Sequence, residues 1–297
     1  MNIKKSGIIT ICGRPNVGKS TLTNTLTGEK IAIVSDKPQT TRNRITAVVN
    51  RGESQFVFLD TPGLHKARTR LGDYMVKVVK ESVADVDGVM LLVEPIAKIG
   101  GPEQELIDRI KTLGVPAMLV INKIDTIQKE ELLAVMAVYG EAYEWDAVMP
   151  ISAQTGEGVD ELMNILEQWL PEGPQLFPED MVTDQPERQI MGEIVREKLL
   201  RSLDKEVPHG TAVEITKFSQ RDNDIIDVHA TIYCEKESHK GIIIGKGGAM
   251  LKKISTQART DMERFMGEKV YLETWVKVKE NWRDNPAAIQ NFGYTEE

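Results

Sequence analysis

Residues 13–20 read Gly13-Arg14-Pro15-Asn16-Val17-Gly18-Lys19-Ser20. An apolar run precedes them at residues 8–12, and a helix-compatible run follows at residues 20–26. Glycines at both ends let successive backbone N–H groups point inward at phosphate oxygens, and the following helix adds the positive end of its dipole. The lysine of such a loop reaches the β- and γ-phosphates, while the serine hydroxyl ligates Mg²⁺. The stretch therefore predicts a nucleotide phosphate-binding loop between a strand and a helix.

A second segment, Leu59-Asp60-Thr61-Pro62-Gly63, ends the apolar strand predicted at residues 55–59. Asp60 thus emerges at the carboxyl end of a strand, where open α/β sheets bind their ligands. A carboxylate there can hold the Mg²⁺ shell, and the Gly63 N–H can meet the γ-phosphate because no side chain blocks its approach. The pattern is short and common by chance, so its value lies in its position after the phosphate loop.

The choice of base rests on Asn122-Lys123-Ile124-Asp125, which follows the strand predicted at residues 117–121. Asp125 can accept hydrogen bonds from the guanine N1–H and N2–H₂, whereas adenine would leave the carboxylate unpaired. Ser152-Ala153 follows a further apolar stretch, and the Ala153 N–H can meet the guanine O6. Asn122 and Asp125 can also be read as turn residues that cap a helix. Four segments in this order favour GTP and GDP with Mg²⁺ as cofactors.

The segment Gln39-Thr40-Thr41-Arg42-Asn43 lies between the phosphate loop and the Asp60 strand. A threonine here would complete the Mg²⁺ shell when a γ-phosphate is present, so that the loop orders with GTP and relaxes with GDP. We choose Thr41 as this ligand, with Thr40 as the alternative and a plain polar loop residue as the third interpretation.

Hydrolysis must proceed without the glutamine that orients water in many GTPases, because Leu64 occupies that position. Slow intrinsic hydrolysis is therefore expected. Asn16 could coordinate a monovalent cation, K⁺, that stabilises the transition state, or it could merely shape the loop. His65 could place water or be an exposed switch residue. The catalytic residues that we predict are Lys19, Asn16, Thr41 and Gly63.

The predicted nucleotide site joins all these segments. We assign Ser20, Thr41 and Asp60 to the metal. The residues assigned to the nucleotide are Gly13, Arg14, Pro15, Asn16, Val17, Gly18, Lys19, Ser20, Thr21, Asp60, Thr61, Pro62, Gly63, Asn122, Lys123, Asp125, Ser152 and Ala153.

Alternating apolar strands and amphipathic stretches over residues 6–170 predict a doubly wound, mostly parallel sheet. Residues 45–59 hold two strands without an intervening helix, which predicts a hairpin and one antiparallel edge strand. We predict an α/β P-loop GTPase domain over residues 1–170, a proline-rich linker over 171–186 and a second domain over 187–297.

The second domain reads as a helix over residues 187–203, strands over 211–216 and 227–234, two helices of which the second covers 249–265, and a strand over 269–279. Gly245-Lys246-Gly247-Gly248 forms the turn between the two helices. Such a turn lets an RNA backbone approach closely. Ile244 and the trailing Lys252 and Lys253 strengthen the pattern. The predicted RNA-binding residues are Ile244, Gly245, Lys246, Gly247, Gly248, Lys252 and Lys253.

Taken together, the chain resembles a translation-factor-like GTPase, and Pro15-Asn16 with Gln39-Thr40-Thr41-Arg42 narrows the resemblance to the Era family. The αββααβ order around the glycine turn is similar to a type II KH domain, an α+β RNA-binding module. The resemblance implies binding of the 3′ end of 16S rRNA, a role in maturation of the 30S ribosomal subunit, and a cytoplasmic protein peripherally attached to the cytoplasmic face of the cell membrane. We expect a monomer.

Charge supports an RNA site without reference to any family. The chain has 297 residues and a net charge of −8, yet residues 240–283 hold ten Lys or Arg against five Asp or Glu. A local basic surface on an acidic protein favours a defined polyanion site, although lysines on a solvated helix face are the plainer interpretation. Trp275, Trp282, Phe292 and Tyr294 could stack on RNA or pack the domain together.

Composition leaves two other classes open. Cys12 and Cys234 both sit in apolar runs of different domains, which predicts reduced core residues in a cytosolic protein. Met1–Lys5 leads into a strand and no apolar run is long enough to span a bilayer, so neither a secretory leader nor an anchor is expected. A tRNA-modifying GTPase would need a methyl-donor or flavin-linked domain and usually a terminal catalytic cysteine, which this chain lacks. A signalling GTPase whose second domain binds protein stays open.

Overall fold

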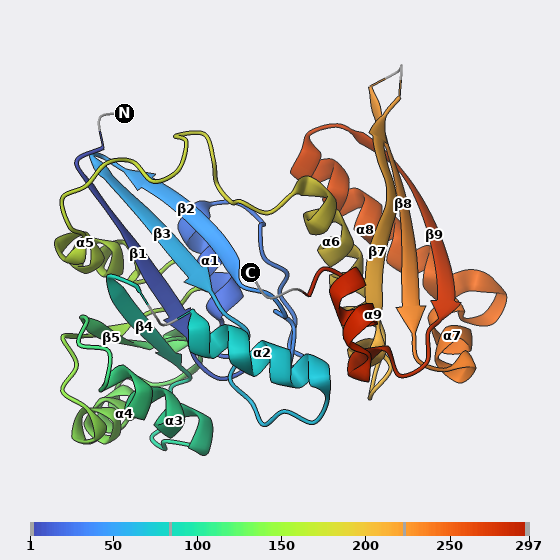
Figure 1. The fold of residues 1–297 in the computed structure, drawn as a ribbon. Helices are drawn as coiled ribbons and strands as arrows, with labels where there is room; N and C mark the ends of the chain where they lie inside the picture. Colours follow the sequence, from blue (N-terminus) through green and yellow to red (C-terminus); the bar gives the residue numbers. More distant parts are fainter. Residues whose placement is uncertain (1–2, 83–84, 222–223, 295–297) are drawn as a thin grey trace. The chain divides into compact units, whose positions relative to one another are not determined.

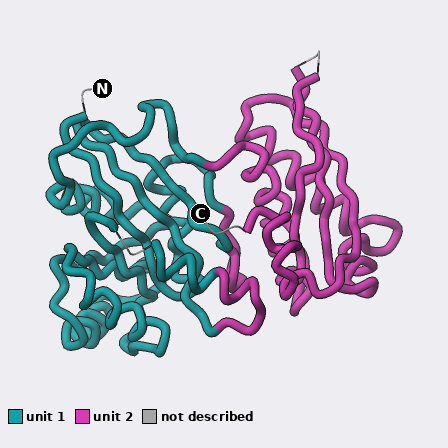
Figure 2. The backbone as a smooth tube through the Cα atoms, viewed as in Figure 1, with its two compact units in different colours: residues 1–32, 41–66, 75–184 teal, residues 33–40, 67–74, 185–297 magenta. Residues whose placement is uncertain are grey.

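The computed structural model describes residues 3–82, 85–221 and 224–294, so that Met1 and Asn2 of the predicted strand entry lie outside it. The chain forms two compact units (Figure 2). Unit 1 comprises residues 1–32, 41–66 and 75–184, and unit 2 comprises residues 33–40, 67–74 and 185–297. Each unit has a hydrophobic core of its own.

Unit 1 is built on a six-stranded sheet of order β2-β3-β1-β4-β5-β6 (Figure 1). Only β2 runs antiparallel to its neighbour among the strands described; the other pairs are parallel. The predicted mostly parallel sheet with one antiparallel edge strand is therefore confirmed. The strands are β1 (Lys5–Cys12), β2 (Ile45–Arg51), β3 (Ser54–Asp60), β4 (Gly88–Val93), β5 (Ala117–Ile121) and β6 (Ala147–Pro150).

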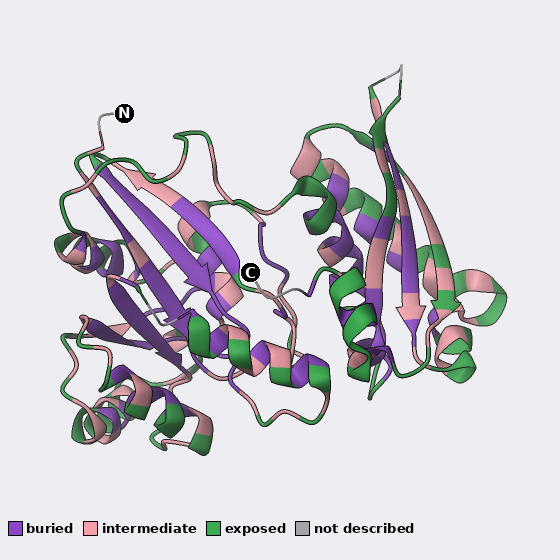
Figure 3. Ribbon diagram, in the orientation of Figure 1, coloured by how far each residue is buried: buried purple, intermediate pink, exposed green. Residues whose placement is uncertain are grey.

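Helices cover both faces of this sheet, and its central strands β4 and β5 are buried along their whole length (Figure 3). One core cluster joins the sheet to α1 and α5, and the other joins it to α2, α3 and α4. Parallel strands connected in this way leave their carboxyl ends along one edge of the sheet. The helices are α1 (Lys19–Thr27), α2 (Arg70–Glu81), α3 (Gly101–Ile110), α4 (Lys129–Ala142) and α5 (Val159–Trp169).

The proline-rich segment after α5 is hydrogen-bonded to unit 1 as far as Val182. The Ser6 N–H donates to the Pro171 carbonyl at 3.2 Å, and the Val48 N–H of β2 donates to the Val182 carbonyl at 2.8 Å. Between these points the Gln55 side chain accepts from the N–H groups of Leu176 and Phe177 at 2.7 and 2.9 Å. The segment therefore runs from β1 past the start of β3 to the outer edge of β2. The domain boundaries at 170 and 187 stay a prediction.

Unit 2 has the predicted αββααβ order, and the α+β class is confirmed. Its sheet has the order β7-β8-β9, with β7 antiparallel and β9 parallel to β8. Helices α6, α7 and α8 bury one face of this sheet in a single core cluster. The elements are α6 (Glu187–Ser202), β7 (Ala212–Gln220), β8 (Ile225–Cys234), α7 (Glu237–Ile244), α8 (Ala249–Met266), β9 (Lys269–Val278) and α9 (Pro286–Asn291).

Strand β7 continues four residues past the end expected at Thr216. A register shift between Ile215 and Lys217 inserts a bulge, after which pairing with β8 resumes. Polar residues beyond the bulge hide the strand from an apolar pattern. In the described parts of the chain, no helix combines the length and apolar character needed to cross a bilayer.

Candidate nucleotide and RNA sites

The phosphate loop joins β1 to α1 at the carboxyl edge of the sheet, as predicted. Gly13 and Gly18 adopt φ of 151° and 101°, which a side chain would strain. A Cβ at Gly13 would lie 2.4 Å from the Leu92 carbonyl oxygen, and one at Gly18 would lie 2.2 Å from the Asn122 amide nitrogen. The loop glycines are thus required by contact with β4 and with the guanine segment as well as by the approach of phosphate.

Lys19 lies beneath this loop and is only 6% exposed. Its ammonium donates to the carbonyls of Gly13 at 3.1 Å and Arg14 at 2.9 Å. Burial lowers the pKa of Lys19 to about 8, against the opposing attraction of Asp60. A partly desolvated cation held by carbonyls gains strongly from a phosphate partner.

Three oxygen-bearing side chains fit a Mg²⁺ ion. The hydroxyls of Ser20 and Thr41 lie 2.8 Å apart, and Asp60 ends β3 with its carboxylate fully buried. Neither oxygen of that carboxylate has a hydrogen-bond partner among the described residues. Burial raises the pKa of Asp60 to about 6, although the charge of Lys19 opposes this rise. Hard oxygen donors around a buried carboxylate suit Mg²⁺, whose charge would satisfy it.

The choice between Thr41 and Thr40 has a geometric side. The Thr40 hydroxyl donates to the Lys37 carbonyl at 2.6 Å, within its own segment, whereas Thr41 meets Ser20. The geometry favours Thr41, whose role as a metal ligand stays a prediction.

Gly63 packs directly on the phosphate loop. A Cβ there would lie 2.5 Å from the Pro15 nitrogen, so no other residue fits without moving the loop. Leu64 is buried in the core and donates its N–H to the Gly13 carbonyl at 3.2 Å. Its side chain therefore cannot orient water, which agrees with the sequence argument. The His65 ring nitrogen Nδ1 lies 2.9 Å from the Gly63 carbonyl oxygen.

Asn122 organises the guanine segment. Its amide donates to the Val17 carbonyl at 2.8 Å, and its carbonyl oxygen accepts from the Ala153 N–H at 2.9 Å. One buried side chain thus joins three of the predicted segments. The Ala153 N–H that we assign to guanine O6 is engaged with Asn122 in this structure. Asp125 is exposed in the 3₁₀ turn η1 (Ile124–Thr126), where a base can reach it.

Several assigned residues support the site from within the fold. Val17 is fully buried, and the Thr61 hydroxyl donates to the Ile11 carbonyl at 2.9 Å. Ser152 is fully buried as well, with its hydroxyl accepting from the Thr155 N–H at 3.2 Å. Their side chains hold the loops, so any contact with nucleotide from these positions comes from the backbone. Thr21 and Pro62 stay predictions.

Sequence reasoning missed two acids beside the phosphate loop. Glu94 follows β4, and Glu103 lies in α3 with 2% of its surface exposed. Both contact the Arg14 side chain, at 2.5 and 3.0 Å. The position of Glu94 in the sequence could have identified it, because Glu94 leaves a strand at the same sheet edge as Asp60 and Asn122.

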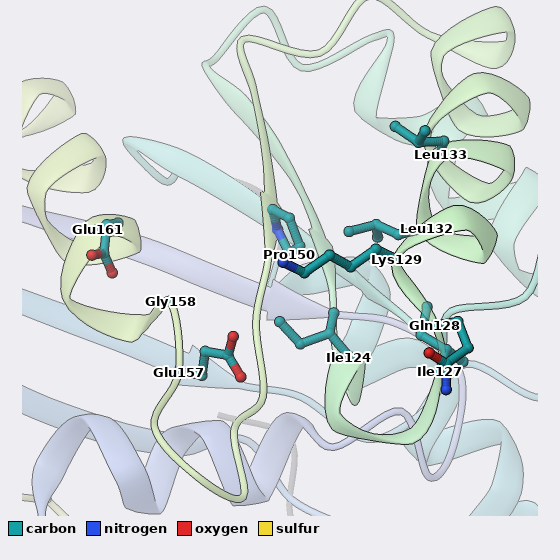
Figure 4. Close-up of a pocket in the computed structure, with 10 residues that line it drawn as sticks. All are labelled: Ile124, Ile127, Gln128, Lys129, Leu132, Leu133, Pro150, Glu157, Gly158 and Glu161. Carbon is teal, nitrogen blue, oxygen red and sulfur yellow. The ribbon is translucent and has the colours of Figure 1, made fainter.

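A pocket of about 750 Å³ lies beyond the guanine segment, between α4 and α5 (Figure 4). Its walls include Ile124, Leu132 and Pro150, with Glu157 and Glu161 on the opposite side. None of the assigned nucleotide residues lines it, so the pocket is separate from the predicted phosphate and metal site.

The glycine turn of unit 2 joins α7 to α8. Gly245, Gly247 and Gly248 all have positive φ, of 73°, 60° and 79°. Lys246 projects from the turn, exposed, and Lys252 and Lys253 are exposed on the first turns of α8. Ile244 is partly buried and Ile243 fully buried. The turn thus offers backbone N–H groups, a helix N-terminus and cations to a phosphate backbone.

The C-terminal aromatic residues were expected either to pack within the domain or to stack on RNA, and they differ in burial. Trp282 is fully buried, donates its ring N–H to the Gly210 carbonyl at 2.9 Å, and contacts Phe292 edge-on. Tyr294 is buried beside it. Trp275 is the exception, since 55% of its surface is exposed on β9.

Known proteins resemble this chain along its whole length. The model of the 50S ribosome-binding GTPase family matches residues 8–123, and the KH domain model matches residues 206–283. The chain is 53% identical over 291 residues to GTPase Era of Alkaliphilus metalliredigens (strain QYMF), which covers 98% of this chain and 99% of that protein. The chain belongs to the Era family. GTPase Era of Clostridioides difficile (strain 630) is 50% identical over 294 residues, with 98% and 99% covered.

Two solved Era structures agree with the fold. Aquifex aeolicus Era bound to GDP·AlF₄⁻ superposes with a TM-score of 0.94 at 39% identity, covering 98% of this chain and 100% of that one. Era in complex with MgGDPNP and nucleotides 1506–1542 of 16S ribosomal RNA gives a TM-score of 0.95 at 39% identity, covering 99% and 100%. The chain is therefore a GTPase with a KH domain, and the predicted family, fold and enzyme class are confirmed.

Proposed function

We propose that this chain binds the 3′ end of 16S rRNA through its KH domain and uses GTP hydrolysis to act in maturation of the 30S ribosomal subunit. The similar Era structure that holds MgGDPNP and nucleotides 1506–1542 of 16S rRNA carries this proposal. The basic turn at Lys246 and the two lysines of α8 supply the matching chemistry here. We assign the role to the 30S subunit because 16S rRNA belongs to that subunit. The family description that matches residues 8–123 names the 50S subunit instead.

In the proposed hydrolysis, the protein binds and orients rather than reacting covalently. Lys19 and the loop N–H groups hold the phosphates, and the Gly63 N–H meets the γ-phosphate. Ser20, Thr41 and Asp60 would hold Mg²⁺, which would supply positive charge to the phosphate oxygens. Thr41 would be ordered when a γ-phosphate is bound and released with its segment when the phosphate is lost.

Potassium is the proposed substitute for an arginine finger. Asn16 adopts φ of 67° in the phosphate loop, and its backbone carbonyl oxygen accepts from Lys123 at 2.7 Å. Its side chain is exposed in the loop that is predicted to hold the triphosphate. Hydrolysis should be faster in K⁺ than in Na⁺, and Asn16→Ala should remove the difference while largely sparing GTP binding. Equal rates in the two salts would count against the cation.

Family resemblance supports three further parts of the proposal: a monomer, a cytoplasmic location, and peripheral attachment to the cytoplasmic face of the cell membrane.

The whole-length match to Era leaves a tRNA-modifying enzyme without support. The protein-binding alternative predicts no RNA affinity. Anisotropy with a labelled RNA of nucleotides 1506–1542 separates the two. Tight binding lost in a scrambled RNA supports the proposal, and absence of binding by the GTP-loaded full chain contradicts it.

A further inference from the structure

Glu94 occupies a position between the two ends of the nucleotide site. It is the first residue after β4, and β4 lies between β1 and β5 in the sheet. The phosphate loop leaves β1 and the guanine segment leaves β5 at the same edge. A side chain at residue 94 can therefore reach both.

Glu94 contacts a residue of the phosphate loop and a residue of the guanine segment. One carboxylate oxygen lies 2.5 Å from the Arg14 guanidinium, and the other lies 2.6 Å from the Lys123 ammonium. Lys123 in turn donates to the Asn16 carbonyl at 2.7 Å. A single carboxylate thus joins a cation of the phosphate loop to a cation of the guanine segment, and the latter returns to the loop backbone.

Glu103 holds the other side of Arg14. Its buried carboxylate lies 3.0 Å from the Arg14 Nε. Arg14 thus directs a terminal nitrogen at Glu94, just after β4, and its Nε at Glu103 of α3. The Glu94, Arg14 and Lys123 side chains are 25%, 34% and 36% exposed, so solvent only partly screens their attraction.

The backbone at both ends of this bridge is unusual. Asn16 and Lys123 have φ of 67° and 65°, in the left-handed region that non-glycine residues rarely adopt. Such conformations persist where surrounding contacts hold them, and they gather at ligand sites. The Lys123–Asn16 contact connects the two residues directly, and Glu94 restrains the lysine that makes it.

We propose that Glu94 is a positioning residue that locks the phosphate loop to the guanine segment and thereby sets how long the nucleotide stays bound. The inference deepens the GTPase activity and is independent of the proposed RNA. Loss of the carboxylate frees Lys123 and loosens one loop against the other. Nucleotide then dissociates faster, while hydrolysis of bound GTP changes little, because the ion pairs of Glu94 are with Arg14 and Lys123 and not with the predicted catalytic residues.

The test compares E94Q, E94D and E103Q in the full chain. Release of a fluorescent N-methylanthraniloyl GDP, chased by excess GDP, gives the dissociation rate, and a single turnover of prebound GTP gives the hydrolysis rate. E94Q should release GDP roughly tenfold faster, as expected for loss of charge-assisted hydrogen bonds. E94D, which keeps the charge but is too short to reach both cations, should fall between E94Q and the wild type. E103Q, which weakens an ion pair with Arg14 and leaves the Glu94–Lys123 pair in place, should have a smaller effect than E94Q.

Two results would overturn the proposal. One is a GDP release rate in E94Q within twofold of the wild type. The other is equal acceleration in E94Q and E103Q, because Glu94 would then act through Arg14 without the bridge to Lys123. Single-turnover hydrolysis in E94Q should stay within twofold of the wild type, and thermal unfolding of the GDP complex guards against misfolding.

Discussion

The phosphate loop and the KH turn are both glycine turns that lead into a helix, but their glycines answer different demands. At Gly18 a side chain would meet the Asn122 amide at 2.2 Å, whereas at Gly247 and Gly248 nothing lies within 4 Å of an added Cβ. Lys19 is buried in the first turn, while Lys246 is exposed in the second. At Gly245, where the second turn begins, a Cβ would lie 2.7 Å from the Met250 Cβ, so the open space belongs to Gly247 and Gly248. Similar glycine patterns thus occur both where neighbouring atoms leave no room for a side chain and where the backbone faces open space.

The largest effect should follow from Gly18→Ala. The φ of 101° and the overlap with Asn122 together cost about 3 kcal/mol or more, so GTP binding should be lost. Isothermal titration with GTP measures this loss. The matched control is Gly247→Ala, where φ is 60° and space is open, so it should cost about 1 kcal/mol and leave GTP binding intact. Equal losses of GTP binding in the two variants would remove the contrast between the turns.

Asp125→Asn should follow in size. The carboxylate is predicted to accept two hydrogen bonds from guanine, each worth about 1.5–3 kcal/mol, so GTP affinity should fall by roughly 3–6 kcal/mol. Preference should shift toward xanthosine triphosphate, whose base reverses the donor pattern. Competition binding with the two nucleotides provides the measurement. Unchanged GTP affinity would remove Asp125 from the site.

The double substitution of Lys246→Asp and Gly247→Asp tests the open turn. Two negative charges placed where the phosphate backbone approaches should weaken RNA binding by about 2–3 kcal/mol. GTP affinity should stay within error, because the residues predicted to bind the nucleotide belong to unit 1. Anisotropy of a labelled RNA in the GTP and GDP states, at fixed salt, gives the RNA affinity. Titration with GTP gives the nucleotide affinity. Full RNA affinity in the double variant would place the RNA elsewhere.

The smallest expected effect is a proton balance at the buried site. With pKa values of about 6 for Asp60 and about 8 for Lys19 before binding, Mg²⁺ should release about half a proton at pH 6, whereas phosphate should take up about half a proton at pH 8. The signs differ because the metal favours a charged carboxylate and the phosphate favours a charged ammonium. Calorimetry of Mg·GDP binding in buffers of different ionisation enthalpy measures both. Binding heats that do not depend on the buffer would contradict the predicted pKa shifts.

Local chemistry made much of the fold predictable. The strand–loop–helix at residues 8–26 follows from apolar spacing and from glycines at fixed points, and both are visible in the sequence. The antiparallel edge followed from two strands with too little chain between them for a helix. The bulge in β7 was missed because a register shift breaks the alternation by which a strand is recognised.

The linear sequence was enough to predict which segments bind the nucleotide and in what order, because each has residue types that only particular chemistry needs. It also determined the two glycine turns, since φ and residue size are local properties. The tertiary structure decided how those segments hold one another: Asn122 joining Val17 to Ala153, and Glu94 joining Arg14 to Lys123. It also decided that Trp275 is exposed while Trp282 is buried. Such contacts join residues far apart in the chain, and their partners are set by strand order and packing, which no local pattern encodes.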